Sequence, residues 1–128
     1  MKLTFCLASF LVLVNSVRAD ERVTANDLKQ IGLAYHAFHD ANNRGPANAE
    51  QLAPFFENSK KLLDHLKTKR IEFFYNVRIT DMTEGTTNTV LAYEKDTPTK
   101  GGFALYGDGT VRKLSAEQFK KAILAKKQ

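Results

Sequence analysis

Cysteine is almost absent from this chain of 128 residues. The single cysteine, Cys6, lies within the apolar run of residues 3–14, in a segment that we expect to be removed. One cysteine cannot close a disulfide within a chain, and a removed one supplies no thiol chemistry. The sequence therefore excludes a disulfide-stapled scaffold, and packing alone must stabilise the folded part.

The sequence also lacks an apolar run long enough to span a membrane. Residues 3–14 give about 12 apolar positions, whereas a spanning helix needs roughly 20. Lys2 precedes this run and a small-x-Ala site at residues 17–19 follows it, as in secretory signal peptides. We predict a signal peptide over residues 1–19 and a single domain over residues 20–128; the alternative is an uncleaved anchor. The expected location is extracytoplasmic (periplasm, cell envelope or secreted), with no stable membrane anchor after cleavage.

A strong excess of one charge is missing too. Lys and Arg number 19 and Asp and Glu 14, which gives a net charge of +5, and loss of residues 1–19 would lower it by two. Arg112, Lys113 and the C-terminal lysines could contact anionic lipid, cell-wall polymer or nucleic acid. Export argues against nucleic acid as a partner, and a solvated helix end is the alternative explanation.

Motifs of catalysis are likewise missing. Beyond residue 19 the chain has two serines, Ser59 and Ser115, and both occupy expected helix caps. There is no Gly-x-Ser-x-Gly, no His-Glu-x-x-His and no phosphate-cradling glycine loop. We therefore expect that the protein is not an enzyme. A pocket lined by His39, Glu94 and Asp96 would be the first sign of catalysis.

Residues 26–40 are predicted to form the helix around which the fold is arranged. Thr24 and Asp27 have the spacing of a capping box, and residues 42–46 are rich in turn formers. The apolar positions fall on one face at helical periodicity. They are Leu28, Ile31, Ala34, Tyr35, Phe38 and Ala41. Such a stripe needs a cover, and the β-rich region after residue 70 can supply it.

Short helices are expected after Asn48 and after Ser59, with Pro54 shortening or kinking the first. We expect these helices to cover Leu33, which points away from the main stripe. Four strands are then predicted by alternation and turn signals, followed by a helix over residues 116–125 with Phe119 and Ile123 inward. The strands are residues 70–79, 90–94, 103–106 and 110–114.

The last two strands flank Gly107-Asp108-Gly109, a strong hairpin signal. A two-residue loop would pair Tyr106 with Val111, whereas a glycine bulge would pair Leu105 with Val111. The predicted fold class is α+β. An N-terminal amphipathic helix packs on an antiparallel sheet of three to four strands, with short connecting helices and a C-terminal helix.

Three motifs occur in a fixed order along the chain. They are Asn-Asp-Leu-Lys-Gln-Ile-Gly-Leu-Ala-Tyr-His-Ala-Phe-His-Asp at 26–40, Glu-Gly-Thr-Thr-Asn-Thr-Val-Leu-Ala-Tyr-Glu at 84–94 and Gly-Gly-Phe-Ala-Leu-Tyr-Gly-Asp-Gly-Thr-Val at 101–111. Together they resemble the bacterial prepilin-like (pseudopilin head) family of unknown function that ends in a His-x9-Asp-Gly box. The matching positions are Leu28, Gln30, Gly32, His39, Asn88, Glu94, Gly101, Gly102, Asp108 and Gly109. The resemblance implies a pilin-like head with envelope or secretion-system proteins as partners.

Two features depart from that family. The box calls for histidine nine residues before its Asp-Gly pair, and this chain has Pro98 at that distance from Asp108. Family members also begin with a processing site and a long apolar helix that anchors and polymerises them, whereas this chain has a cleavable signal peptide. The resemblance therefore implies a soluble exported head and not filament assembly.

Two sets of side chains are candidate ligands for a divalent ion. His36 and His39 lie three apart on one helix and could bind one metal, with His65 or Asp108 as a further ligand. Glu94, Asp96 and Asp108 could instead gather around a calcium ion. In the alternative, one histidine bonds a backbone group, the other is solvated, and the carboxylates serve turns. No cofactor is therefore expected beyond this ion.

The sequence thus favours a non-enzymatic exported protein with a pilin-like domain that acts in protein–protein interaction or envelope structure. A small extracytoplasmic metal- or ligand-binding module is the alternative.

Overall fold

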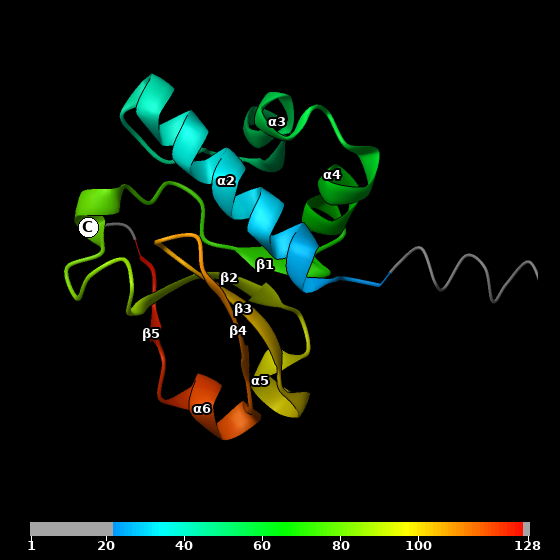
Figure 1. Cartoon of the computed structure of the whole chain (residues 1–128), viewed down its shortest axis with the longest axis vertical. Coiled ribbons are helices and arrows are strands. Elements are labelled where there is room, and N and C mark those ends of the chain that lie inside the picture. Colours follow the sequence, from blue (N-terminus) through cyan, green and yellow to red (C-terminus); the bar gives the residue numbers. More distant parts are fainter. Residues whose placement is uncertain (1–21, 127–128) are drawn as a thin grey trace, which may run out of the picture.

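The computed structural model describes residues 22–126. The expected signal peptide, residues 1–19, and Cys6 lie outside this range. The signal peptide therefore remains a prediction from the sequence. The described part has a mixed α+β fold in which an N-terminal helix precedes an open sheet (Figure 1). The expected fold class is confirmed.

The helices that the sequence predicted occur in the expected order, and two further short helices form over residues 79–81 and 97–100, where none was predicted. The helical elements are α2 (Ala25–Asn42), α3 (Ala49–Leu52), the 3-10 helix η1 (Ala53–Phe56), α4 (Lys60–Lys67), the 3-10 helix η2 (Ile79–Asp81), α5 (Thr97–Lys100) and α6 (Ala116–Lys120). The strands are β1 (Ile71–Phe73), β2 (Thr89–Glu94), β3 (Gly102–Tyr106), β4 (Val111–Leu114) and β5 (Ile123–Leu124). Strands β1 to β4 are antiparallel neighbours in sequence order. Among the described residues the sheet therefore has five strands, one more than the sequence predicted, because β5 pairs in parallel with β2.

Helix α2 begins and ends where the sequence predicts. The Thr24 hydroxyl accepts from the Asp27 N–H at 3.1 Å, and the Asp27 carboxylate accepts from the Thr24 N–H at 2.9 Å. Asn43 ends the helix in the left-handed conformation, with φ of 53°. The apolar stripe is buried from Leu28 to Phe38, and only its last member, Ala41, is exposed.

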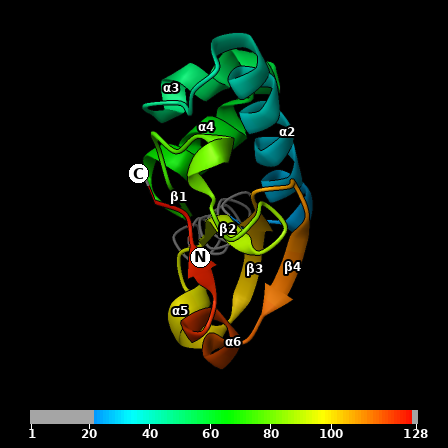
Figure 2. The same cartoon turned by 90° about the vertical axis from the view of Figure 1, so that its left-hand side faces the viewer.

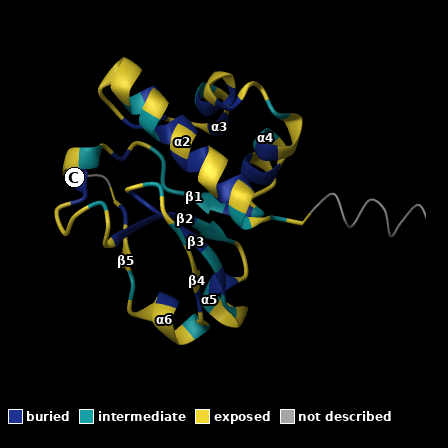
Figure 3. Ribbon diagram, in the orientation of Figure 1, coloured by how far each residue is buried: buried dark blue, intermediate teal, exposed yellow. Residues whose placement is uncertain are grey.

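Apolar residues gather on both faces of the sheet. Helix α2 lies across one face, and α3, η1 and α4 pack beside it (Figure 2). Phe119 of α6 packs against Tyr93 on the other face, with ring centroids 4.7 Å apart. Most of β2 and β3 is buried between these layers (Figure 3). The sheet therefore carries a large core on the α2 side and a smaller one below.

The strand expected over residues 70–79 is much shorter in the structure. Strand β1 ends at Phe73, and Asn76 adopts a positive φ of 63°. The Asn76 N–H donates to the Pro46 carbonyl at 2.8 Å, and the Tyr35 hydroxyl donates to the Val77 carbonyl at 2.7 Å. The prediction was wrong because the backbone still bonds to β2 at Phe74 but from Asn76 onward bonds to α2 and to the loop after it.

The C-terminal helix is also shorter than predicted. Helix α6 ends at Lys120, and β5 then places Ile123 and Leu124 beside β2, where they are 43% and 37% exposed. The Ala125 N–H donates to the Val90 carbonyl at 2.8 Å. Ile123 is therefore not an inward residue of a helix, because strand pairing outweighs helix propensity at this end.

The two alternatives for the hairpin register are resolved by the pairing of Leu105 with Val111. Gly109 adopts a positive φ of 92°, the Gly109 N–H donates to the Tyr106 carbonyl, and the Tyr106 N–H donates to the Thr110 carbonyl. This is the glycine-bulge arrangement, in which a non-glycine residue at position 109 would be strained.

Leu33 is not covered by the short helices, contrary to the sequence prediction. Its side chain is 65% exposed, and it is the most exposed of the large apolar residues that the structure describes. Helices α3 and α4 instead pack against the buried stripe, with Leu52, Phe56, Leu62 and Leu66 in the same core. The side of α2 that carries Leu33 faces a groove.

Helix α4 is joined to α2 through a buried histidine. His65 is 1% exposed, its Nε2 lies 3.6 Å from the Asp27 carboxylate, and neither ring nitrogen has a hydrogen-bond partner within residues 22–126. Lys61 also lies 3.4 Å from that carboxylate. Burial lowers the pKa of His65, and the neighbouring charge of Asp27 offsets this only in part.

We expect His65 to make folding stability fall in mild acid. The unfolded chain takes up a proton near pH 6.5 whereas the folded chain resists it, so stability is full above that pH and is lost as pH falls below it. Urea unfolding at about pH 7.5 and about pH 5 measures the loss. His65→Leu should flatten the dependence and His36→Gln, which deletes another histidine, should keep it. An equal slope in His65→Leu would contradict the assignment.

Candidate functional site

An open groove lies between α2 and the turn that joins β3 to β4. Its volume is about 730 Å³, about twice that of a second hollow, of about 360 Å³, beside Glu94. One side is formed by α2 and the other by the turn and the start of β4. The lining residues are Ala25, Asn26, Lys29, Gly32, Leu33, His36, Asp108, Gly109, Thr110 and Val111.

Glycine allows α2 to lie close to the hairpin at the floor of the groove. A Cβ on Gly32 would stand 2.8 Å from Cδ1 of Leu105 and 3.4 Å from Cα of Gly109. Leu105 is fully buried under this contact, whereas space around Gly109 is open. Helix α2 therefore packs directly on Leu105, and the backbone of the turn at Gly109 is accessible from outside.

The polar groups beside the floor are held by local hydrogen bonds. His36 Nε2 lies 2.7 Å from the Gly107 carbonyl, so this nitrogen carries the proton and donates. The Asp108 carboxylate accepts from the Thr110 N–H at 3.0 Å and from its hydroxyl at 2.7 Å. Burial acts to raise the pKa of Asp108, but the two Thr110 hydrogen bonds outweigh it and the pKa is lowered. These contacts fix the turn against α2.

Strand β4 forms the open edge of the sheet beside the groove. Within residues 22–126 it pairs with β3 and with no other strand. Tyr106 of β3 and Thr110 are hydrogen-bonded to each other. In an antiparallel pair, hydrogen-bonded and non-hydrogen-bonded positions alternate, so the N–H and C=O groups of Arg112 also point toward β3. The main-chain N–H and C=O groups of Val111 and Lys113 therefore point to the outer edge.

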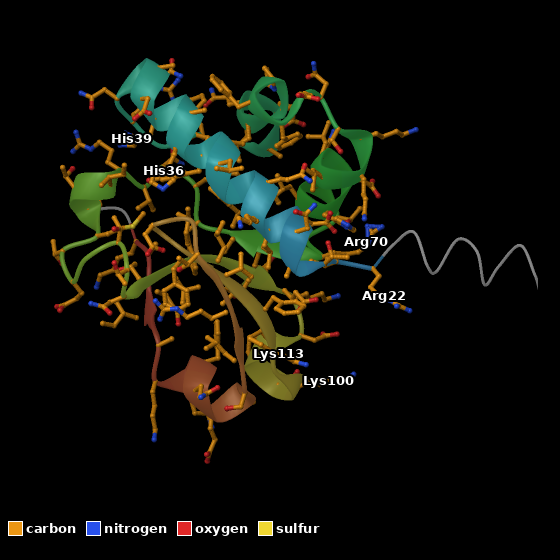
Figure 4. The ribbon with its side chains drawn as sticks, in the orientation of Figure 1. Arg22, His36, His39, Arg70, Lys100 and Lys113 are labelled. Atoms are coloured by element: carbon orange, nitrogen blue, oxygen red, sulfur yellow. The ribbon has the colours of Figure 1, made fainter. Side chains whose placement is uncertain are left out.

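The two candidate metal histidines bond to different parts of the backbone. His36 bonds to Gly107, whereas His39 Nε2 accepts from the Ile79 N–H at 3.2 Å. Figure 4 shows both on α2, with Lys113 toward the other end of the sheet. Within residues 22–126, no group of three or more His, Cys, Asp or Glu could hold a metal ion. The structure thus gives the histidines structural partners and does not bring them together with His65.

The carboxylates proposed for calcium are divided between two places. Glu94 and Asp96 line the smaller hollow with Arg70, Lys95 and Lys100, whereas Asp108 lies at the groove. Glu94 also accepts a short hydrogen bond of 2.6 Å from the Phe103 N–H, which joins β2 to β3. The hollow does not include His39, so the set that would have suggested catalysis is not assembled.

Most of the remaining motif positions have a structural role, and Gln30 is the exception. Leu28 is fully buried, Gln30 is exposed on α2, and Asn88 bonds to the Glu84 carbonyl at 3.1 Å. Gly101 has a φ of 78°, and a Cβ on Gly102 would lie 2.6 Å from the Glu94 carboxylate. Pro98 lies in the first turn of α5, where proline is tolerated.

The comparisons with known proteins add no relative. The chain matches no protein-family model, no curated protein and no solved structure. Among residues 22–126, no helix has the length and apolar character needed to cross a membrane.

The groove and the open edge of β4 were not predicted from the sequence. The apolar Leu33 on the outer side of α2 and the basic residues Arg112 and Lys113 were the sequence signals that pointed to this surface.

Proposed function

We propose that this chain is a non-catalytic, exported protein-interaction domain with a pilin-like architecture, and that it binds partner proteins of the cell envelope at the groove between α2 and β4. The observation that carries the proposal is the exposure of Leu33 on the rim of this groove. A leucine in that position contributes binding energy only when a partner covers it.

The groove has the parts of a binding surface. Leu33 and Val111 supply apolar contacts, Gly109 leaves room for a partner backbone, and the edge of β4 supplies hydrogen-bonding groups. The turn is fixed by the His36 contact, so little ordering would be needed on binding. The pattern of residues 1–19 supports export, and the three-motif resemblance supports envelope proteins as the partner class.

A charge at position 33 should abolish this binding. Leu33→Glu places a carboxylate in the apolar rim, and we expect at least about a tenfold loss of partner affinity with no large loss of stability. Ala37→Glu is the matched control, because Ala37 is exposed on the same helix, one turn further, and does not line the groove.

A photoreactive residue at position 33, and separately at 37, identifies the partner in the native host. We expect an envelope protein to be cross-linked from position 33 and not from 37, and its affinity for the purified protein to fall with Leu33→Glu alone. Equal cross-linking from the two positions, or none, would overturn the proposed function.

A further inference from the structure

We infer that the groove accepts an extended, acidic segment of the partner protein as an added strand on the edge of β4. This inference rests on the proposed function, and it names the chemistry and the backbone geometry of the occupant. It is carried by three features of the same edge: the direction of its main-chain groups, the apolar rim and the charge of the strand.

The main-chain groups of β4 are arranged for a further strand. Val111 and Lys113 are separated by one residue, and both direct N–H and C=O groups outward. An extended segment hydrogen-bonds at this spacing, which is the geometry of β-strand addition. Gly109 precedes the strand, and nothing lies within 4 Å of where its Cβ would be. An approaching backbone therefore meets open space at the start of the edge.

The apolar rim of the groove, Leu33 and Val111, can contact side chains of the added strand. Val111 shares the α2 face of the sheet with Leu105, its partner on β3, and lines the groove together with Leu33. Every second residue of an added strand would point toward this face. An apolar residue there would cover Leu33, which is 65% exposed without a partner.

The charge of the edge selects an acidic occupant. Arg112 and Lys113 are exposed on β4, and Lys29 is exposed on the α2 side of the groove. The Arg112 guanidinium is held 4.0 Å above the Tyr106 ring and donates to the Thr87 carbonyl at 3.0 Å. Among the described residues that line the groove, Asp108 is the one acid, and Thr110 already hydrogen-bonds its carboxylate. Acidic side chains of an added strand that point away from α2 would therefore lie beside the positive charge of Arg112, while Lys29 and Lys113 add positive charge on the α2 side of the same edge.

The same charges argue against a second copy of this chain on the edge. A two-fold antiparallel pairing of β4 centred on Lys113, whose main-chain groups point outward, would set this lysine opposite its own copy. Like charges directly opposite one another destabilise a strand pair. Basic residues on edge strands also protect against such pairing in general, and that protective role alone is the competing explanation.

Labelled decapeptides test the inference by fluorescence anisotropy against the purified protein. We expect a peptide of alternating Val and Glu to bind at least about tenfold more tightly than one of alternating Val and Lys, with a marked loss at high salt. The Val-Glu peptide with alternate amide nitrogens methylated should lose most of its affinity, because it cannot complete the strand hydrogen bonds. Equal binding of all three peptides, or none, would overturn the inference and leave only the protective role.

Variants at Lys113 test whether the added strand binds at the edge of β4. Lys113→Pro removes an outward N–H and no hydrogen bond to β3, so it should weaken binding of the Val-Glu peptide by about tenfold more than Lys113→Ala does. If Lys113→Pro does not fold, binding of the methylated Val-Glu peptide to the unaltered protein still tests whether strand hydrogen bonds are needed. If the cross-linked partner depends on Leu33 but binds Lys113→Pro as well as Lys113→Ala, strand addition is wrong and the proposed function stands.

Discussion

Replacing Gly45 by alanine is expected to destabilise the fold by about 3 kcal/mol or more, or to prevent folding. A Cβ at this position would lie under 3.0 Å from the nitrogen, the carbonyl carbon and the carbonyl oxygen of Val77. All three are backbone atoms, so no side-chain rotation can relieve the overlap. The Val77 carbonyl also accepts the Tyr35 hydroxyl, and moving it would break a buried hydrogen bond between the loop and α2.

Gly107→Ala is the matched control for this prediction. Gly107 is also buried, but the one atom closer than 3.0 Å to its Cβ would be Sδ of Met82, at the flexible end of a side chain that can change rotamer. The Thr86 carbonyl oxygen, at 3.2 Å, would need to shift by only a few tenths of an ångström. We expect a loss of about 1 kcal/mol there, measured by urea unfolding of both variants. Similar losses for the two variants would show that the loop around Gly45 adapts and does not hold α2 rigidly.

Leu105→Ala is the second change with a large expected effect. Leu105 is fully buried at the contact between α2 and the hairpin, and its truncation should cost about 2–5 kcal/mol of unfolding free energy. The cavity would lie directly below Gly32, so the seat of α2 would loosen and the groove would lose its fixed width.

Leu33→Ala removes the same atoms from an exposed position and should change stability by no more than about 0.5 kcal/mol. Urea unfolding of the pair separates burial from residue type. The two variants should also differ in binding: Leu33→Ala weakens the partner contact in a folded protein, whereas Leu105→Ala acts through stability. A large loss of stability in Leu33→Ala would show that this leucine belongs to the core.

The sequence predicted those parts of the fold whose causes are local. The caps at Thr24, Asn48, Ser59 and Ser115 each accept a hydrogen bond from the backbone three residues on, and such signals need no tertiary context. The end of α2 at Asn43 and the hairpin at Gly109 were visible for the same reason, because a left-handed residue favours Asn or Gly. The shortening of the first connecting helix at Pro54 was likewise local.

The wrong secondary-structure predictions arose where contacts with segments distant in sequence determine the backbone conformation. Residues after Phe73 alternate like a strand, but Asn76 bonds to Pro46 and Val77 to Tyr35, which lie far away in sequence. Ile123 fits the helical pattern until β2 is present to pair with it. The candidate site was missed for a related reason. The sequence marks Arg112 and Lys113 as part of a basic patch, but only the strand order shows that they lie on an open edge of the sheet.

The parallel pairing of β5 with β2 has a consequence for biosynthesis. Strand β2 is an inner strand, yet the part of it around Val90 receives its second neighbour only from Leu124, which is made after β3, β4 and α6. A nascent polypeptide whose β5 is still inside the ribosome would have that stretch uncovered, so the sheet would close late in synthesis.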